Sequence, residues 1–226
     1  MKKIVILTGA GISAESGIST FRDSDGLWEN HRVEDVATLE GYLRNRQKVL
    51  DFYNERRRVS YHAQPNEAHL QLARLEQRYE VHIITQNIDT LHERAGSTHV
   101  LHLHGRVDYA RSERNPDLLV EVGDKDIRLG DKAPDGAQLR PHIVWFGEPV
   151  PNIDPASNLC KEADIFVVIG TSMNVYPAAG LIHFVPLSTP CYLIDPKAVL
   201  IHRPITNLQE KATTGVRRLV DKLMAQ

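Results

Sequence analysis

The 226-residue chain has few of the residues that would build a disulfide scaffold or a thiolate metal centre. Its two cysteines, Cys160 and Cys191, stand about thirty residues apart, and no C-x-x-C pair occurs. A disulfide framework and a thiolate zinc site are therefore excluded. Both cysteines are surrounded by apolar residues, which favours buried, unreactive thiols.

The chain also lacks a charge excess and a long apolar run. Its 27 Lys and Arg residues nearly balance 29 Asp and Glu residues, for a formal net charge of −2. No general attraction to nucleic acid or to an anionic membrane is expected. No segment approaches the roughly 20 apolar residues of a membrane span, and the apolar run at residues 4–7 is too short for a signal peptide. We therefore expect a cytoplasmic protein that binds neither nucleic acid nor membrane; the sequence does not indicate its oligomeric state.

Short apolar segments alternate with helical patterns along the chain. Residues 65–79 and 213–224 repeat apolar side chains at the spacing of one helix face. The apolar segments lack strict alternation, which is typical of strands covered on both faces. The pattern predicts an α/β fold, a Rossmann-like, mostly parallel sheet with helices on both faces. The expected strands are residues 4–8, 81–85, 99–103, 165–170 and 191–194.

Two insertions interrupt this alternation and predict a small lobe. The first, residues 29–60, is polar and helical in pattern, and the second, residues 106–140, is rich in Asp, Gly and Arg. In the second insertion only LLVEV and DIRL resemble strands, and we expect a short antiparallel sheet there. The main domain would then consist of residues 1–28, 61–105 and 141–226.

A glycine-rich loop, TGAGISAESGISTFR, follows the first expected strand. Gly9-x-Gly11-x-x-Ala14 between a strand and a helix-compatible run fits the dinucleotide fingerprint. In that interpretation Gly9 permits a tight turn, Gly11 lets backbone N–H groups reach a pyrophosphate, and Ala14 lets the helix approach the strand. An ordinary strand–helix turn explains the motif equally well. The acidic residue that a simple dehydrogenase carries about 20 residues further on is missing, which disfavours hydride transfer.

Five blocks, in order along nearly the whole chain, resemble the sirtuins, the NAD-dependent protein lysine deacylases. They are GAGISAESGISTFR, TQNIDTLHERAG, LHG, PHIVWFGE and GTSMNVYPAA. The resemblance implies a Rossmann-like domain and a small lobe, with NAD as co-substrate and an acyl-lysine protein or peptide meeting it in the cleft. It also implies attack of the acyl oxygen on the ribose, with release of nicotinamide and 2′-O-acyl-ADP-ribose.

That reaction needs a general base beside the ribose. His104 ends the strand-like HVLHLH segment at a carboxyl edge of the sheet, and an imidazole with a pKa near 6.5 suits proton removal at neutral pH. A histidine that merely ends a strand is the alternative, and His102, on the same strand face, is the main competitor. The resemblance selects His104 as the base.

Gln86, Asn87 and Asp89 follow another expected strand, where their amide and carboxylate groups suit ribose hydroxyls and a nicotinamide amide. An Asx turn is the alternative. The resemblance assigns Asn87 a catalytic place at the ribose, Ile88 and Asp89 to the nicotinamide pocket, and Phe21 to shielding the ribose intermediate from water. The full set of expected cofactor-binding residues is Gly9, Ala10, Gly11, Ala14, Phe21, Arg22, Trp28, Gln86, Asn87, Ile88, Asp89, Gly170, Thr171, Ser172, Asp195 and Ala212.

Tyr53 and Arg56 lie three apart on one helix face in DFYNERRR. Resemblance to the sirtuins that remove acidic acyl groups implies that this pair binds the terminal carboxylate of succinyl- or malonyl-lysine, since a guanidinium holds a carboxylate through two hydrogen bonds. A solvated basic face is the alternative for this arginine run. A strand edge for the substrate backbone is expected from His142–Glu148, with Val144, Phe146 and Gly147 as substrate-binding residues.

The sequence departs from the family in the small lobe. Sirtuins usually carry two cysteine pairs after the HG block, which bind a structural zinc, whereas residues 106–126 contain no cysteine. Ser112 and Asn115 stand about where the first pair would be, and neither is a suitable zinc ligand. We expect a lobe that folds without metal.

Two further functions are compatible with the same motifs. An NAD glycohydrolase or mono-ADP-ribosyltransferase would use the same pocket if water or a protein nucleophile replaced the acyl oxygen. A non-catalytic, NAD-responsive binding module would use the pocket without turnover.

Overall fold

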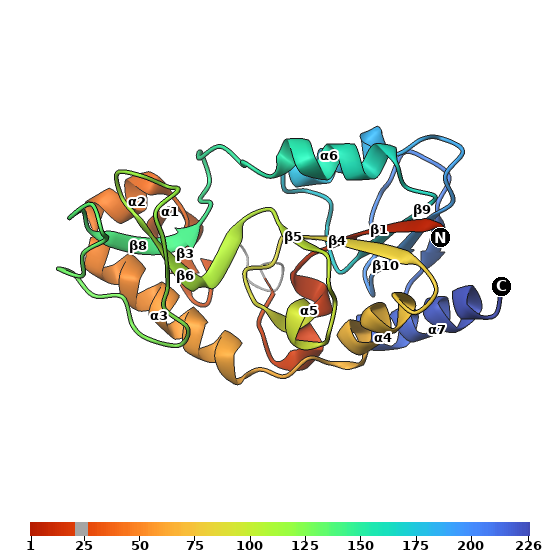
Figure 1. The fold of residues 1–226 in the computed structure, drawn as a ribbon, viewed down its shortest axis with the longest axis horizontal. Coiled ribbons are helices and arrows are strands. Elements are labelled where there is room, and N and C mark those ends of the chain that lie inside the picture. The colour runs from red at the N-terminus through yellow and green to blue at the C-terminus, as the bar shows by residue number, and fades with distance from the viewer. Residues whose placement is uncertain (21–26) are drawn as a thin grey trace.

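The computed structural model describes residues 1–20 and 27–226 (Figure 1). Its main sheet has the strand order β11-β10-β9-β1-β4-β5, and every neighbouring pair is parallel. Counted along the chain, this is the doubly wound order 3-2-1-4-5-6. The strands are β1 (Lys3–Thr8), β4 (Glu80–Thr85), β5 (Val100–His102), β9 (Ile165–Ile169), β10 (Cys191–Ile194) and β11 (Thr206–Leu208).

Helices cover both faces of this sheet, as the sequence predicts (Figure 1). In β1, Ile4 and Ile6 belong to the core shared with α4 (Glu67–Leu75) and α7 (Ala212–Met224). Val5 and Leu7 belong to the opposite core, with α6 (Ile153–Lys161) and the 3₁₀ helix η3 (Ala178–Phe184). Because neighbouring side chains point to opposite faces, an unbroken apolar run is what such a strand needs.

Both cysteines lie in the second of these cores. Cys160 and Cys191 are free and buried, and burial raises the pKa of the Cys160 thiol to about 12. The prediction that both thiols are buried is confirmed, and the raised pKa is consistent with unreactive thiols.

The small lobe combines helices with a three-stranded antiparallel sheet, seen at the left of Figure 1. Its own apolar core is separate from the two cores of the main sheet. The helices are α1 (Val33–Val36), α2 (Leu39–Arg44) and α3 (Arg46–His62); the sheet has the order β7 (Leu119–Glu121), β6 (Gly105–Ser112), β8 (Leu139–Ile143). A two-residue connection joins β2 (Leu27–Trp28) and β3 (His31–Arg32). The division of the chain at residues 28, 60, 105 and 140 stays a prediction, and β8 crosses its last boundary.

The prediction of a strand in DIRL is wrong. Ile127 is buried in the lobe core, and its backbone pairs with the Asn54 side chain of α3: Ile127 N–H donates to Oδ1 (2.9 Å), and Asn54 Nδ2 donates to Ile127 O (3.0 Å). A side chain that satisfies both backbone groups replaces a strand partner, which the sequence does not reveal. β6, residues 139–141 of β8 and the polar edge strand β11 were not expected.

Ser112 lies where the family's first cysteine pair would begin, and it organises the turn after β6. Its hydroxyl donates to Asp135 (2.6 Å) and accepts the backbone N–H groups of Arg114 (3.1 Å) and Asn115 (3.2 Å). Within residues 1–20 and 27–226, no group of three or more His, Cys, Asp or Glu side chains is placed to hold a metal ion. Folding of the lobe without zinc stays a prediction.

No helix in the described part of the chain is long and apolar enough to cross a membrane.

Candidate active site

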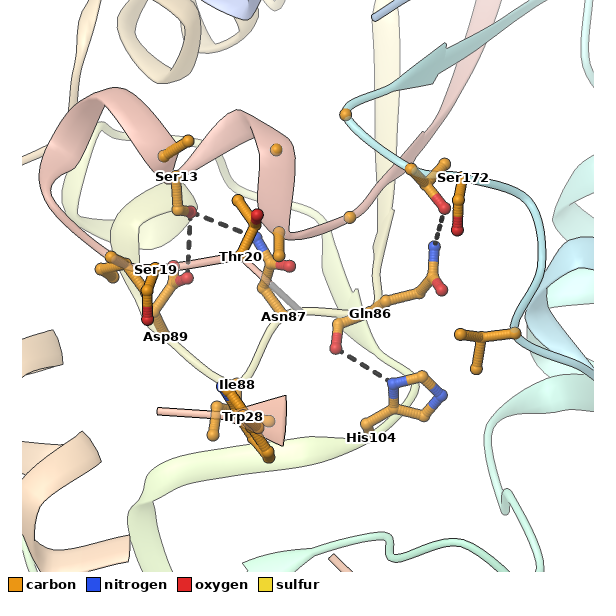
Figure 2. A pocket seen from close by; sticks show the side chains of 18 of the residues that line it. Ser13, Ser19, Thr20, Trp28, Gln86, Asn87, Ile88, Asp89, His104 and Ser172 are labelled. Carbon is orange, nitrogen blue, oxygen red and sulfur yellow. Dashed lines mark hydrogen bonds between the residues drawn. The ribbon is translucent and has the colours of Figure 1, made fainter. Parts of the chain in front are cut away.

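A cavity of about 570 Å³ lies at the carboxyl ends of the main-sheet strands, where the strand order reverses (Figure 2). Its wall combines the loops after β1, β4, β9 and β10 with α3 and the segment after β8. Phe21 and Arg22 lie outside the described residues. Every other expected site residue lines this cavity: Gly9, Ala10, Gly11, Ala14, Trp28, Tyr53, Arg56, Gln86, Asn87, Ile88, Asp89, His104, Val144, Phe146, Gly147, Gly170, Thr171, Ser172, Asp195 and Ala212.

The glycines of the first loop pack against the loop after β9. A Cβ on Gly11 would lie 2.6 Å from Gly170 Cα, and one on Gly9 would lie 2.8 Å from Gly170 O. Gly11 N–H donates to Gly170 O (2.9 Å) and is thus engaged within the protein; contact of other backbone N–H groups with a pyrophosphate stays a prediction. Gly9 has a φ of −126°, which any residue adopts, so a tight turn does not require it. The glycines bring two cavity-lining loops together.

The sequence is compatible with a single helix after this loop, and the structure differs. Two 3₁₀ helices, η1 (Ala10–Ile12) and η2 (Ala14–Ser16), follow β1. Helices this short have little dipole, so binding of phosphate at the N-terminus of a long α-helix has no basis here.

Ser13 links the two side chains expected at the ribose and nicotinamide. Its hydroxyl donates to Asp89 Oδ2 (3.0 Å) and accepts Asn87 Nδ2 (3.1 Å), as Figure 2 shows. Burial raises the pKa of Asp89, and hydrogen bonds from the Leu91 backbone and from Ser13 oppose this. The bond from Nδ2 to Ser13 fixes the orientation of the Asn87 amide in the cavity wall.

His104 is held by one ring nitrogen. Its Nδ1 is 3.0 Å from Gln86 O, and because a carbonyl only accepts, Nδ1 carries the proton (Figure 2). In the neutral ring the lone pair is therefore on Nε2. Burial lowers the pKa of His104 below its ordinary 6.5, and the Gln86 bond opposes this. The ring is thus a neutral base at neutral pH, which is the form that removes a proton.

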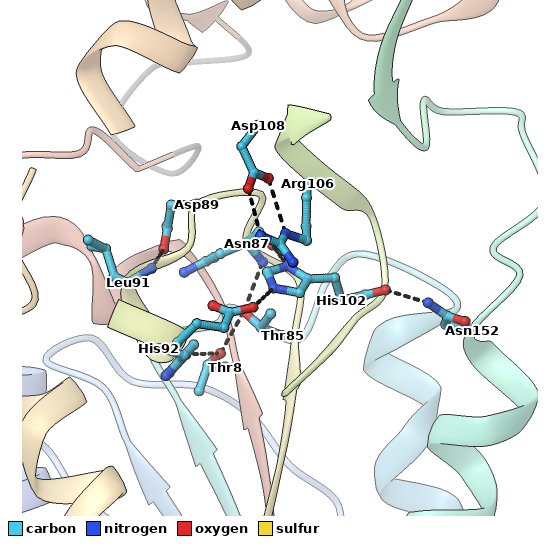
Figure 3. Close-up of polar contacts among 11 residues, drawn as sticks. Thr8, Thr85, Asn87, Asp89, Leu91, His92, His102, Arg106, Asp108 and Asn152 are labelled. Atoms are coloured by element: carbon cyan, nitrogen blue, oxygen red, sulfur yellow. Dashed lines mark hydrogen bonds and ion pairs between the residues drawn. The ribbon is translucent and has the colours of Figure 1, made fainter. Parts of the chain in front are cut away.

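His102, the competing histidine, lies outside the cavity lining. Its Nδ1 pairs with Asn87 O (3.0 Å; Figure 3). Its Nε2 pairs with Glu93 Oε1 (2.7 Å). Burial would raise the pKa of Glu93, but the hydrogen bond and charge of His102 hold it below its ordinary value. Both ring nitrogens are engaged, so His102 positions the Asn87 backbone and has no lone pair left for a substrate.

Replacement of His102 by alanine is expected to weaken turnover without abolishing it. The change leaves Asn87 O without its partner, a loss of about 1–3 kcal/mol, or about 5- to 150-fold in rate if the whole effect reaches the transition state. Steady-state kinetics of His102→Ala and His104→Ala, measured side by side, check this. A loss in His102→Ala as deep as that in His104→Ala would contradict the assigned roles.

The far end of the cavity is lined by Asp195 and Ala212, as expected, and also by Lys197 and Lys211. Asp195 is buried at the end of β10, and its Oδ1 accepts the N–H of Lys197 (2.9 Å). A buried carboxylate beyond a strand's carboxyl end suits ribose hydroxyls. The two lysines suit negative charge, and neither stands in a motif that identifies it from the sequence.

One face of α3 is turned to the cavity. Tyr53, Arg56 and Ser60, each about one turn from the next, all line it. Arg57 instead donates from Nε to Val107 O (2.7 Å), and Arg58 is exposed and paired with Asp126. Only Arg58 therefore fits the alternative of a solvated basic face.

The segment after β8 is not a strand, because β8 ends at Ile143. Val144 N–H already donates to His104 O (3.0 Å), Phe146 N–H donates to Ala37 O (2.9 Å), and Gly147 turns with a φ of +87°. The expected edge at His142–Glu148 is therefore a strand only at His142 and Ile143, and pairing of the substrate backbone with this segment stays a prediction. Nearly half of the Phe146 side chain is exposed, so it offers an apolar surface at the cavity's rim.

The family model described as "Sir2 family" matches residues 9–177. The NAD-dependent protein deacylase of Bacteroides thetaiotaomicron is 53% identical over 231 residues, covering 99% of each chain. The chain belongs to the Sir2 family. A solved Sir2 homologue in complex with NAD has a TM-score of 0.90 and 38% identity, over 99% of this chain and 90% of that one. A Sir2–p53 peptide–NAD⁺ complex has a TM-score of 0.80 and 28% identity, over 99% and 94%.

The cavity residues of this Sir2 protein that sequence reasoning missed are of two kinds. Ser13 stands inside the glycine block, where a hydroxyl between small residues is a usable signal. The others have no signal that marks them as site residues, and the fold brings them to the cavity. Among them, Ser19, Trp145 and Tyr176 stand inside the quoted blocks, whereas Ser60, Lys197 and Lys211 stand outside any motif.

Proposed function

We propose that this NAD-dependent protein deacylase prefers lysines whose acyl group ends in a carboxylate, such as succinyl- and malonyl-lysine. The single observation that carries the preference is Arg56, a cation whose side chain is 7% exposed in the cavity wall. One end of this guanidinium, Nη1, is paired with Glu29, and a cation fixed in the cavity wall attracts the terminal carboxylate of an acyl group. Membership of the Sir2 family and the similarity to NAD-dependent protein deacylases support NAD dependence and protein deacylation.

Tyr53 supports the same assignment. Its hydroxyl accepts Trp145 Nε1–H (3.0 Å) and is fully buried, and burial raises its pKa, so it stays a neutral phenol. A neutral phenol retains an O–H that can donate to a carboxylate. Trp28 and Phe52 pack edge-on against its ring and fix its position.

The residues around the cavity suit NAD as the co-substrate, which supplies the ADP-ribose acceptor and the glycosidic bond that breaks. Asn87 and Asp89, joined by Ser13, would bind the ribose and the nicotinamide amide. Thr171 and Ser172 would donate to phosphate or ribose oxygens, with Gly9, Gly11 and Gly170 keeping their two loops close enough to do so.

His104 would act as the general base. The Gln86 carbonyl fixes its tautomer, so Nε2 accepts a proton from a ribose hydroxyl while the acyl group is transferred from the lysine nitrogen to the ribose. The products are nicotinamide, the free lysine and 2′-O-acyl-ADP-ribose, with one water consumed. The side chain that excludes bulk water here is assigned by resemblance to Phe21, which lies outside the described residues.

The test is a comparison of matched peptides. We expect the wild-type protein with NAD to release nicotinamide only when acylated peptide is present, and to use succinyl- and malonyl-lysine with a higher kcat/KM than acetyl-lysine. Mass spectrometry of the peptide and of the nucleotide product follows the acyl group. Nicotinamide release without peptide would indicate a glycohydrolase or an ADP-ribosyltransferase, and an acetyl preference would overturn the proposed specificity.

A further inference from the structure

The arginine of the acyl pocket already has a carboxylate partner within the chain. Arg56 Nη1 forms an ion pair with Glu29 Oε1 (2.5 Å) and donates to Ser19 Oγ (3.0 Å). The Ser19 hydroxyl in turn donates to the same Glu29 oxygen. Glu29, Ser19 and Arg56 thus form a closed triangle, which we call the arginine clamp.

The clamp occupies only one end of the guanidinium. Among residues 1–20 and 27–226, Arg56 bonds to Ser19 and Glu29, and both bonds are made by Nη1. Arg56 and Ser19 line the cavity, whereas Glu29 approaches from outside that lining, with 39% of its side chain exposed. A carboxylate inside the cavity would therefore meet a guanidinium that Glu29 has partly neutralised.

The backbone at Glu29 has a conformation that glutamate rarely adopts. Glu29 (φ +49°) and Asn30 (φ +63°) form the two-residue connection between β2 and β3. Two positive φ values are typical of a type I′ turn, in which asparagine, aspartate and glycine are preferred. Glu29 is thus held in a left-handed position, with its side chain committed to the clamp.

The ion pair between Arg56 and Glu29 affects which acyl groups the pocket can accept. A neutral acyl group brings no counter-charge, so a buried Arg56 without Glu29 would stay unpaired beside it, which is costly. An acidic acyl group brings its own carboxylate, which must share the guanidinium with Glu29 or displace it, and two carboxylates at one cation repel each other.

We propose that Glu29 is a specificity-determining residue, a built-in counter-ion of Arg56 that broadens the pocket to uncharged acyl groups and competes with acidic ones. This inference rests on the proposed function, because it takes the acyl group to reach Arg56. It adds that Arg56 and Glu29 together, and not Arg56 alone, set the preference for acidic over neutral acyl groups.

The test is the selectivity ratio, kcat/KM for a succinyl-lysine peptide divided by kcat/KM for the matched acetyl-lysine peptide. In Glu29→Gln we expect this ratio to rise about tenfold, through a lower KM for succinyl peptide and a higher KM for acetyl peptide. Glu29→Asn suits the left-handed backbone and gives the same expected rise in a variant that favours the turn. Glu34→Gln removes an exposed carboxylate of the same segment and should leave the ratio unchanged.

A ratio that is unchanged or lower in both Glu29 variants would overturn the inference, since Glu29 would then only hold Arg56 in place. The double variant Glu29→Gln/Arg56→Met separates this failure from a failure of the proposed function. If Arg56→Met alone does not lower the ratio, the acyl group does not reach Arg56 and the proposed function fails. If Arg56→Met lowers it and Glu29→Gln does not raise it, only the counter-ion inference fails. When both hold, the double variant should match Arg56→Met.

Discussion

Replacing His104 with alanine is expected to reduce deacylation by about 10²- to 10⁴-fold, the usual contribution of a general base. The ring is placed by a single bond from Nδ1 to Gln86 O, and Nε2 is the only lone pair that this histidine offers. No neighbouring histidine substitutes for it, because both nitrogens of His102 are engaged. Single-turnover kinetics with a succinyl peptide measure the loss.

The same variant should bind NAD nearly as well as the wild type. The groups expected to hold NAD belong to the loops after β1, β4 and β9, which bonds among Ser13, Asn87, Asp89, Gln86 and Thr171 connect. The His104 ring adds only one bond to these loops, to Gln86 O. Calorimetric titration with NAD is the control. Turnover within about tenfold of the wild type would contradict the role of His104, and a parallel loss of NAD binding would make it a structural residue instead.

The pH dependence of kcat/KM is an independent test of His104 as the general base. Burial lowers the pKa of His104 below 6.5, so the ring stays neutral down to that lowered pKa and is protonated, hence inactive as a base, beneath it. The plot of kcat/KM against pH should therefore fall on its acid side at a pH below 6.5.

Arg56→Met is expected to lower kcat/KM for succinyl-lysine by about 100-fold and to change acetyl-lysine use far less. Hydrogen bonds to a charged group are worth about 1.5–3 kcal/mol, so the loss of a guanidinium–carboxylate contact removes about 3 kcal/mol of binding. Methionine keeps much of the apolar stem, and Glu29, with 39% of its side chain exposed, stays hydrated when its partner is removed. Steady-state kinetics on both peptides provide the measurement.

Arg58→Met is the matched control, with the same substitution two residues further along α3. Arg58 is exposed and paired with Asp126 and Glu55, away from the cavity. Its replacement should leave both peptides unaffected. An equal loss on succinyl- and acetyl-lysine in Arg56→Met would show that Arg56 supports the lobe and does not select the acyl group.

The main sheet was predictable because burial on both faces leaves a strong signal. The apolar runs at β1 and β9 belong to strands whose neighbouring side chains pack into two different cores. The edge strand β11 was not predictable, since its three residues, Thr206–Leu208, are mostly polar and exposed. DIRL has the composition of a strand, but a side chain of α3 satisfies the Ile127 backbone instead.

The different orientations of His102 and His104 could not be predicted from the strand pattern. Strand alternation puts His102 and His104 on one face, yet β5 ends at His102 and the chain bends before His104. The His102 ring therefore bonds to the Asn87 backbone, whereas the His104 ring lines the cavity (Figures 2 and 3). The three consecutive arginines of α3 could not be told apart by composition either. Because neighbouring helix positions point in different directions, Arg56 faces the cavity, Arg57 bonds to Val107 O, and Arg58 is exposed.

The most direct measurement is a crystal structure of the protein with NAD and a succinyl-lysine peptide, using His104→Ala if turnover is too fast. We expect both molecules in the 570 Å³ cavity, the succinyl carboxylate within hydrogen-bond distance of Arg56, and the ribose beside position 104. A carboxylate turned to solvent, or a ribose out of reach of that position, would contradict it.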